Sequence, residues 1–259
     1  MMKNIIFFLA FLYTFTSVAQ EQHSSFKAGE WFKFRIHYGW FTASYATLQI
    51  KEENLEGKPV LHIMGEGKSS GLLNAFFKVE DYYESYIDPV KMMPYRFIRK
   101  INEGGHIKDI QIDFDHGKSE ALITDYKHKT ERTVTVERDV QDMVSSFYYL
   151  RNVIKPETLK KGDVEYVNMF FDKENYVFKL KFLGKETVKT DMGKIRCLKF
   201  RPYVIAKDVF KEEESMTVWI SDDDNRMPVK IKADILVGSI TADLEAFKGL
   251  KHPFKIVVD

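Results

Sequence analysis

Ser69 is the residue whose sequence context most resembles that of a catalytic nucleophile. It lies within Gly67 to Gly71, which satisfies the Gly-x-Ser-x-Gly pattern of hydrolases that hold a serine on a sharp turn between a strand and a helix. An alternating segment precedes this turn, but Leu72 to Phe77 leaves room for only one or two helical turns. The overlapping Gly-Lys-Ser is not a phosphate loop, because His62 occupies the place of its first glycine. The pattern therefore favours a flexible turn, and a serine hydrolase using Ser69 is the least favoured alternative.

Carboxylates and histidines could hold a metal ion, but their spacing is wrong for one. The run Asp222 to Asn225 offers hard oxygen ligands, yet it lacks the alternating spacing and the glycine of a calcium loop. It reads as a solvated hairpin tip, and whether it binds a cation is left open. His106, His116 and His128 lie near one predicted hairpin without the tight spacing of zinc ligands. We therefore predict no metal site and no cofactor.

Two further groups of polar residues are interpreted as structural. Asp113 and Asp115 share one strand face, like a carboxylate pair, but read as the solvent side of an amphipathic strand. Cys197 is the one cysteine of the chain, so neither a disulfide nor a two-cysteine metal site can form within it. We expect an inert, partly buried thiol. With no catalytic constellation in the sequence, we predict that the protein is not an enzyme.

Two apolar segments are the best candidates for a binding surface. Large aromatic residues follow Gly39 where the first two strands must reverse, and a concentrated apolar stretch follows Gly71. Packing in the core explains both segments, and the alternative is a lid or the wall of a groove. The 21 phenylalanines and 13 tyrosines could line a curved sheet that holds an acyl chain. The candidate ligand-binding residues are Trp40, Phe41, Leu72, Leu73, Phe76 and Phe77.

The first nineteen residues have the features of a signal peptide. Lys3 supplies a positive charge, Ile5 to Phe15 an apolar region, and Ser17 to Ala19 a cleavage site between small residues. Later in the chain, no stretch approaches the roughly 18 apolar residues of a membrane span. We predict an exported protein, periplasmic or extracellular, without a transmembrane segment in its mature form.

The charge balance argues against nucleic-acid binding. The chain has 39 basic and 38 acidic residues, and cleavage of the leader would remove Lys3 and make the two numbers equal. A nucleic-acid-binding protein would carry a basic excess or stripe. The mature chain is long enough to bury a sizeable core without covalent help.

Apolar and polar residues alternate along most of the chain, as in half-buried strands. Residues 31 to 38 show the pattern clearly, with Phe32, Phe34 and Ile36 on one face. Turn residues such as Glu56 to Pro59 separate the segments, and such short links favour antiparallel meanders. The predicted strands are 31–38, 43–53, 59–66, 78–88, 95–103, 106–115, 119–124, 164–171, 176–183, 194–204, 215–221, 228–237 and 239–247.

A shift of 133 residues aligns the chain with itself. Glycines, aromatic residues and branched aliphatic residues coincide at this offset, and a Met-Pro pair does so to within one residue. Such a pattern indicates an internal duplication. The matched positions include Gly29 with Gly162, Tyr86 with Trp219, Ile87 with Ile220, Gly105 with Gly238 and Phe114 with Phe247. We predict that residues 29 to 114 and 162 to 247 superpose strand for strand.

A short helix is predicted between the two repeats. Asp142 can cap it, and apolar residues follow at helical spacing up to Leu150, before Pro156. The predicted fold is all-β, with two similar curved antiparallel sheets joined by this helix. The expected divisions are a signal peptide at 1–19, a first repeat at 20–139, a helical connector at 140–161 and a second repeat at 162–259.

The order and spacing of several short motifs resemble an exported bacterial family known only as domain of unknown function 3108. The motifs extend over nearly all of the mature chain. They are residues 29–34 with 38–39, 83–88 with Pro94, Asp142 with 145–151, and 218–223 with 227–228 and 238–240. The resemblance implies an envelope protein of β architecture and no established catalytic residues.

The function predicted from the sequence is that of a non-catalytic envelope protein. It would bind an apolar or amphipathic ligand, such as a lipid, or a partner, in the concavity between two β halves. The alternative is a structural or assembly factor whose exposed edge strands recruit another envelope protein by strand addition. The sequence does not identify the ligand, the partner or the oligomeric state.

Overall fold

Fourteen strands and one helix make up the described part of the chain. A computed structural model describes residues 24–71, 74, 78–205 and 216–257. The helix is α2 (Met143–Val153). The strands are β1 (Trp31–Tyr38), β2 (Phe41–Leu55), β3 (Lys58–Ser69), β4 (Val79–Ile87), β5 (Pro94–Glu103), β6 (His106–Asp115), β7 (Glu120–Asp125), β8 (Thr130–Thr135), β9 (Val164–Phe171), β10 (Glu174–Thr190), β11 (Gly193–Ile205), β12 (Met216–Ser221), β13 (Pro228–Asp234) and β14 (Ser239–Lys248).

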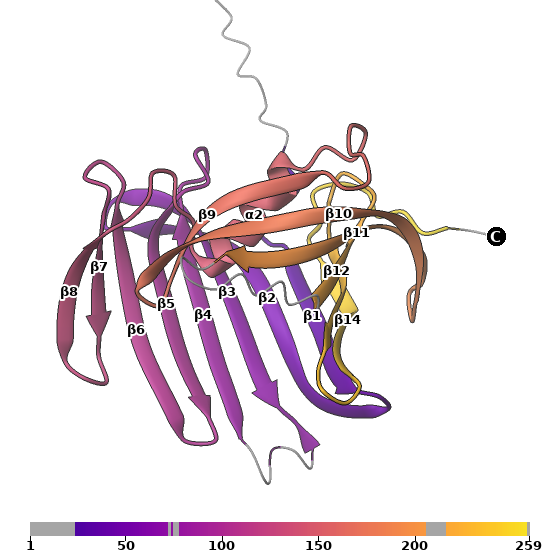
Figure 1. Cartoon of the computed structure of the whole chain (residues 1–259), viewed down its shortest axis with the longest axis horizontal. Helices are drawn as coiled ribbons and strands as arrows, with labels where there is room; N and C mark the ends of the chain where they lie inside the picture. The colour runs from indigo at the N-terminus through magenta and orange to yellow at the C-terminus, as the bar shows by residue number, and fades with distance from the viewer. Residues whose placement is uncertain (1–23, 72–73, 75–77, 206–215, 258–259) are drawn as a thin grey trace, which may run out of the picture.

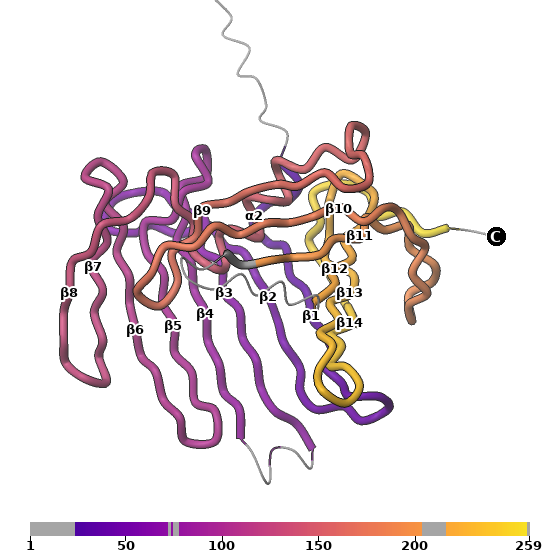
Figure 2. The backbone as a smooth tube through the Cα atoms, viewed as in Figure 1, coloured from indigo at the N-terminus to yellow at the C-terminus, as the bar shows by residue number. Residues whose placement is uncertain are grey.

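All fourteen strands belong to one antiparallel sheet. Its order is β8-β7-β6-β5-β4-β3-β2-β1-β14-β13-β12-β11-β10-β9, so two meanders meet where β1 pairs with β14. The all-β prediction is confirmed, but the two expected sheets are continuous because β1 and β14 exchange backbone hydrogen bonds along their length. The sheet curves strongly, so that β9 to β11 cross over the strands of the first meander (Figures 1 and 2).

The alternating pattern located thirteen strands correctly and missed one. β8 was missed because five of its six side chains are exposed, so it has no buried face to produce an alternation. The prediction also extended β13 to residue 237, whereas the strand ends at Asp234. The apolar residues Ile235 to Val237 resemble the end of a strand, but they form the turn into β14.

The largest core cluster lies between the sheet and α2. Alternate residues of β6, Ile110, Ile112 and Phe114, are buried on the face that looks toward the helix, and Tyr148 of α2 is fully buried among them. Phe170 of β9 joins the same cluster, so the second meander covers the first. Burial of these apolar side chains is the main contribution to stability, and it fills the inner face of the curved sheet.

Asp142 fixes the start of α2 and ties the helix to the sheet. Its Oδ1 accepts hydrogen bonds from the backbone N–H groups of Val144 and Ser145, each at 2.7 Å. Its Oδ2 accepts a hydrogen bond from the hydroxyl of Ser85 on β4 at 2.6 Å. The predicted cap is confirmed, and it is completely buried. Burial raises the pKa of Asp142 to about 6, although the hydrogen bonds that it accepts act to lower this pKa.

This raised pKa predicts a pH-dependent stability. An aspartate in an unfolded chain titrates near about 3.9, so the native state holds the Asp142 proton more tightly. Its contribution to the free energy of unfolding should be greatest below about pH 4 and fall by up to about 3 kcal/mol as the pH rises through 6. Asp142→Asn caps equally well and does not titrate. Urea titrations of both proteins should show the wild type losing stability relative to the variant between pH 4 and 6.5, and a constant difference would contradict the prediction.

The strands of the two meanders recur at the offset seen in the sequence. β6 begins at His106 and β14 at Ser239, 133 residues apart, and a register shift falls at Tyr86/Ile87 in one half and at Trp219/Ile220 in the other. Pro94 and Pro228 each open a strand, as predicted. A duplication would produce such correspondences, and both the duplication and the superposition of the two halves stay predictions.

A buried arginine joins parts of the chain that are distant in sequence. Arg151, near the end of α2, donates to both carboxylate oxygens of Glu30 at 2.6 and 2.8 Å, and neither side chain is exposed by more than 1%. The same guanidinium donates to the backbone oxygen of Asn225 at 2.8 Å. The ion pair therefore connects the helix, the segment before β1 and the turn between β12 and β13.

Candidate functional site

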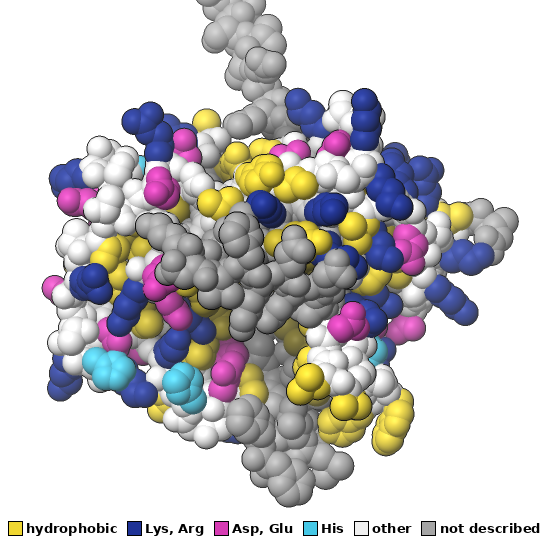
Figure 3. Space-filling view, viewed as in Figure 1, with side chains coloured by type: hydrophobic (Ala, Val, Ile, Leu, Met, Phe, Trp, Pro, Cys, Tyr) yellow, Lys and Arg dark blue, Asp and Glu magenta, His cyan; other side chains and the backbone are white. Residues whose placement is uncertain are grey.

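Two neighbouring hairpin tips carry the most exposed large apolar side chains. Pairing of Tyr38 with Ile240 places the β1–β2 turn beside the β13–β14 turn, and the Tyr38 hydroxyl donates to the backbone oxygen of Val237 at 2.9 Å. Trp40 is 93% exposed and Leu236 is fully exposed. Hydrophobic side chains gather at this lower edge of the molecule (Figure 3). We call the following residues the apolar tip surface: Tyr38, Trp40, Ile235, Leu236, Val237 and Ile240.

The two tips are held together by close packing. Gly238, at a φ of 78°, lies directly against the ring of Tyr38, and a Cβ there would sit 2.9 Å from the phenolic oxygen. The position therefore requires glycine both for its backbone conformation and for the contact. This packing fixes Leu236 and Val237 on one side and Trp40 on the other side of a single edge.

The apolar tip surface contains no charged side chain, unlike the neighbouring turns at the same end of the sheet. No Asp, Glu, Lys or Arg occurs from residue 38 to residue 50 or from residue 235 to residue 242. The β5–β6 turn, at the same end of the sheet, is flanked by Glu103 and His106, and the β7–β8 turn contains Lys127 and Lys129. An uncharged apolar edge can enter an apolar phase without the desolvation of an ion.

The structure describes two of the six predicted binding residues, Trp40 and Phe41. Trp40 is not part of the core, so the interpretation as core packing is wrong for this residue. Phe41 is partly buried at the start of β2 and meets the Trp40 ring edge to face at 6.4 Å. The other predicted residues lie outside the described part of the chain: Leu72, Leu73, Phe76 and Phe77.

Ser69 serves as a hydrogen-bonding group within its turn. Its Oγ accepts from the Val79 backbone N–H at 2.9 Å and donates to Asn74 Oδ1 at 2.8 Å. Among the residues that the structure describes, no histidine is hydrogen-bonded to this hydroxyl. The strand that ends at Ser69 is antiparallel to both of its neighbours, unlike the parallel sheet of a nucleophile elbow.

The acidic turn after β12 is held by protein groups. Asp222 pairs with Lys185 at 3.0 Å and Arg196 at 3.2 Å. Asp223 Oδ1 accepts from the Ser221 hydroxyl at 2.7 Å and from the Asn225 backbone N–H at 3.0 Å. These contacts agree with a turn stabilised by Asp and Asn side chains.

Of the remaining polar candidates, His106 and His128 line one cavity, and the others are held by different partners. His116 bonds to the Pro94 backbone oxygen and His128 to Asp125, while Asp113 pairs with Arg96 and Asp115 with Lys118. Over residues 24–71, 74, 78–205 and 216–257, no group of three or more His, Cys, Asp and Glu side chains could hold a metal ion. Cys197 is buried, and burial raises the pKa of its thiol to about 12, which makes it unreactive.

Leu236 and its neighbours were missed by the sequence analysis. Their apolar character was visible, but a strand predicted to residue 237 placed them in the sheet. Gly238 was the available indication of an earlier turn, because glycine adopts the positive φ found there. No described helix is long and apolar enough to cross a membrane.

Comparisons with known proteins agree with an all-β fold. A beta-barrel-like protein of the domain of unknown function DUF1849 from Brucella abortus has a TM-score of 0.56 and 9% identity, over 84% of this chain and 96% of that one. A DUF1089 family protein from Pseudomonas aeruginosa covers 73% of this chain and 88% of its own at 8% identity, with a TM-score of 0.40, too low to establish a shared fold. No curated protein matches.

The family comparison confirms the resemblance seen in the sequence. The model for "Protein of unknown function (DUF3108)" matches residues 33–245, which include every strand from β2 to β13 and the helix between the meanders. The chain therefore belongs to the DUF3108 family.

Proposed function

We propose that this protein is exported to the cell envelope and binds lipid, without catalysis, through the apolar tip surface. The observation that carries the proposal is the pairing of two uncharged hairpin tips that expose Trp40 and Leu236 almost completely. Exposed apolar residues that gather on one edge mark an interaction surface more often than scattered ones do. The predicted signal peptide, which lies outside the described residues, would deliver the protein to a compartment bounded by lipid.

The proposed lipid would contact the edge of the sheet and not its concavity. The inner face is occupied by α2 and by core residues such as Tyr148 and Phe170. At the tips, by contrast, Trp40, Leu236 and Val237 stand away from the body of the protein. Each such side chain gains roughly 1.5 to 3 kcal/mol on full transfer out of water. Together the three would contribute roughly 4.5 to 9 kcal/mol.

The occupant that fits best is the boundary between the headgroups and the acyl chains of a bilayer. Tryptophan is enriched at that depth, and aliphatic residues beside it can reach the acyl chains. A protein partner would need a cleft that matches two protruding tips, whereas lipid adapts to their shape. Because residues 38–50 and 235–242 contain no charged side chain, binding should depend little on anionic lipid or on salt.

Flotation with phosphatidylcholine vesicles tests the proposal. Wild-type protein should float with the vesicles, and Trp40→Asp combined with Leu236→Asp should reduce the bound fraction at least tenfold, because two carboxylates would have to be desolvated. Both positions are exposed, so the melting temperature should change little. Val90→Asp is the matched control, since Val90 is 66% exposed in a turn at the opposite end of the sheet.

A fluorescent fatty-acid analogue separates two forms of the proposal. Vesicle binding without uptake of the analogue would indicate docking on a bilayer, and uptake would indicate capture of a single chain. Equal flotation of the wild type and the double variant, or no flotation of either with no uptake of the analogue, would overturn the assignment of this surface.

Recruitment of a partner by strand addition has less support. β8 is one edge of the sheet, and its exposed side chains include Glu131 and Arg132, charges that discourage pairing with another strand. At the other edge, residue 141 already forms a parallel bridge to Met169 of β9. Strand recruitment stays an untested alternative.

A further inference from the structure

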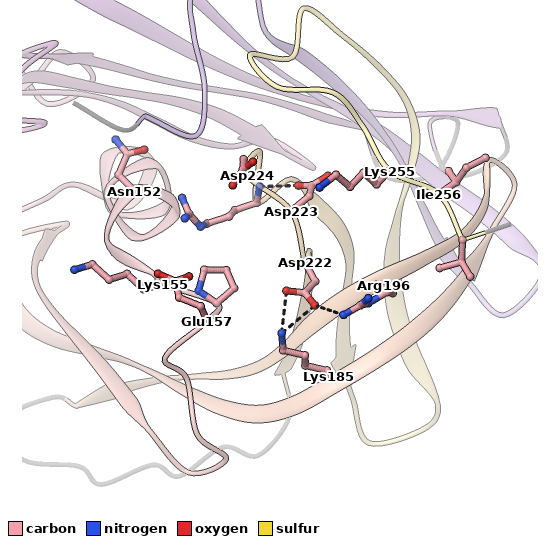
Figure 4. A pocket seen from close by; sticks show the side chains of 13 residues that line it. Asn152, Lys155, Glu157, Lys185, Arg196, Asp222, Asp223, Asp224, Lys255 and Ile256 are labelled. Atoms are coloured by element: carbon pink, nitrogen blue, oxygen red, sulfur yellow. Dashed lines mark hydrogen bonds and ion pairs between the residues drawn. The ribbon is translucent and has the colours of Figure 1, made fainter. Parts of the chain in front are cut away.

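A second site lies at the opposite end of the sheet from the apolar tip surface. A cavity of about 870 Å³ opens between the end of α2, the turn from β12 to β13, the β10–β11 hairpin and the segment after β14. Side chains of both charges line it (Figure 4). Those used below are Lys155, Glu157, Arg196, Asp224, Arg226 and Lys255.

Arg226 is the buried cation of this cavity. Its side chain belongs to a residue only 5% exposed, and Nη1 donates to the backbone oxygen of Arg151 at 2.9 Å and to the hydroxyl of Ser25. Its Nε has no hydrogen-bond partner, and no carboxylate among the described residues lies within ion-pair distance of the guanidinium. Burial lowers the pKa of Arg226, and Asp224 and Glu157 stabilise its charge only at longer range, so a bound anion would stabilise the charge further.

The turn itself does not require an arginine at this position. The matching turn of the first meander also has six residues, ends in a Met-Pro pair, and places Met92 at a φ of 60° where Arg226 has 47°. Met92 is buried, as Arg226 is. An apolar side chain therefore satisfies the same backbone and the same burial in one half. The guanidinium in the other half needs a different explanation.

The other charges of the cavity determine what could neutralise Arg226. Lys185 and Arg196 share one carboxylate, that of Asp222 (Figure 4), so the three side chains together keep one positive charge. Lys155 and Lys255 are exposed at the mouth and form no ion pair with the described residues. Glu157, which is exposed, also lines the cavity and could accept hydrogen bonds from hydroxyl groups.

We propose that this cavity binds a small hydroxylated molecule through its phosphate or carboxylate group, with Arg226 as the anchor. Arg226 lines the cavity, where its guanidinium can donate to an oxygen of the oxyanion, whereas the Nε–H itself is enclosed by protein atoms. The two backbone and hydroxyl acceptors on Nη1 hold the guanidinium in place, so little side-chain freedom would be lost on binding. Lys155 and Lys255 add two further cations among the residues that line the cavity.

The test is calorimetric titration of the mature protein at constant ionic strength. The probes are inorganic phosphate, glucose 6-phosphate, glucuronate and, as the uncharged reference, glucose. We expect binding of the anions in the millimolar range or tighter, no binding of glucose, and tighter binding of the sugar anions than of phosphate if hydroxyl groups are recognised. If inorganic phosphate bound more tightly than both sugar anions, the site would be specific for a free anion. That result would overturn the proposal that the ligand is hydroxylated.

Variants separate the anchor from the general charge of the cavity. Arg226→Met copies the residue of the matching turn and should weaken anion binding at least tenfold, while Arg226→Lys should retain part of it. Arg132→Gln is the control, because it removes one exposed cation from β8, which does not line the cavity, and it should bind within about threefold of the wild type. If Arg226→Met fails to fold, the double change of Lys155→Gln with Lys255→Gln decides, with an expected loss of at least fivefold.

Two results would overturn the inference. One is unchanged anion affinity in a folded Arg226→Met variant or, where that variant does not fold, in the double lysine variant. The other is the absence of binding by the wild type for every anion at 20 mM or below, a concentration chosen as about tenfold above a weak site of ~2 mM. Neither result bears on the lipid proposal, because the two surfaces lie at opposite ends of the sheet.

Discussion

Replacing Arg151 with methionine should lower the free energy of unfolding by about 3 to 5 kcal/mol, the usual effect of removing one partner from a buried ion pair. The change leaves the Glu30 carboxylate in the core without its two hydrogen bonds of 2.6 and 2.8 Å. It also removes the donor to the Asn225 backbone oxygen, which connects α2 with the β12–β13 turn. The expected loss is large because the structure cannot hydrate the isolated carboxylate.

The double variant distinguishes an ion pair from simple packing. Glu30→Gln combined with Arg151→Met removes both charges and should be less destabilised than Arg151→Met alone, since a neutral pair leaves no buried ion. Lys33→Met is the matched control on β1, because Lys33 pairs with Glu245 at the surface and should change stability by no more than about 1 kcal/mol. Urea denaturation of the four proteins measures these differences. Equal losses in the single and double variants would contradict the role of the charge.

Replacing Gly249 with alanine should destabilise the protein by about 2 to 5 kcal/mol, through combined backbone strain and overpacking. Gly249 has a φ of 70°, and a Cβ would overlap the backbone carbonyl of Gly29 and approach the nitrogen of Glu30. That backbone cannot move aside, because Gly29 and Glu30 are hydrogen-bonded to Ile50 of β2 at 3.0 Å. A movement of Gly29 and Glu30 large enough to relieve the overlap would break these hydrogen bonds and displace the Glu30 carboxylate from Arg151.

Gly105→Ala measures the effect of backbone strain in the absence of a steric overlap. Gly105 also has a positive φ, of 90°, but a Cβ there would have no neighbour within 4 Å. We expect about 1 to 2 kcal/mol of destabilisation from the backbone conformation alone. Thermal melting and urea titration of both variants should therefore place Gly249→Ala well below Gly105→Ala. Similar stabilities would show that the contact between the end of β14 and Gly29 can relax.

The strands were predictable because alternation and turn chemistry are local properties. β1 has the same bounds in the prediction and in the structure, as do β6 and β9. The helix start at Asp142 was predictable for the same reason, since capping involves residues two and three positions along the chain. β8 was not, because an exposed edge strand has no apolar face to identify it.

The candidate surface was only half visible in the sequence. Trp40 attracted notice as an aromatic residue at a predicted turn, but its near-complete exposure could not be deduced from its neighbours in the chain. Its companion Leu236 lies almost 200 residues away and was assigned to a strand. The two meet only because β1 pairs with β14, and periodicity does not specify which strands become neighbours.

The sequence by itself determined the strand content, the repeated pattern at an offset of 133 residues and the family, because these depend on the order and period of residues along the chain. The tertiary structure alone decided that the two meanders share one sheet and that Arg151 reaches Glu30. It also decided that Arg226 is buried beside a cavity while Trp40 is 93% exposed. The physical reason is that the burial of Arg226 and the ion pair of Arg151 depend on contacts between segments more than 100 residues apart, which local residue patterns do not encode.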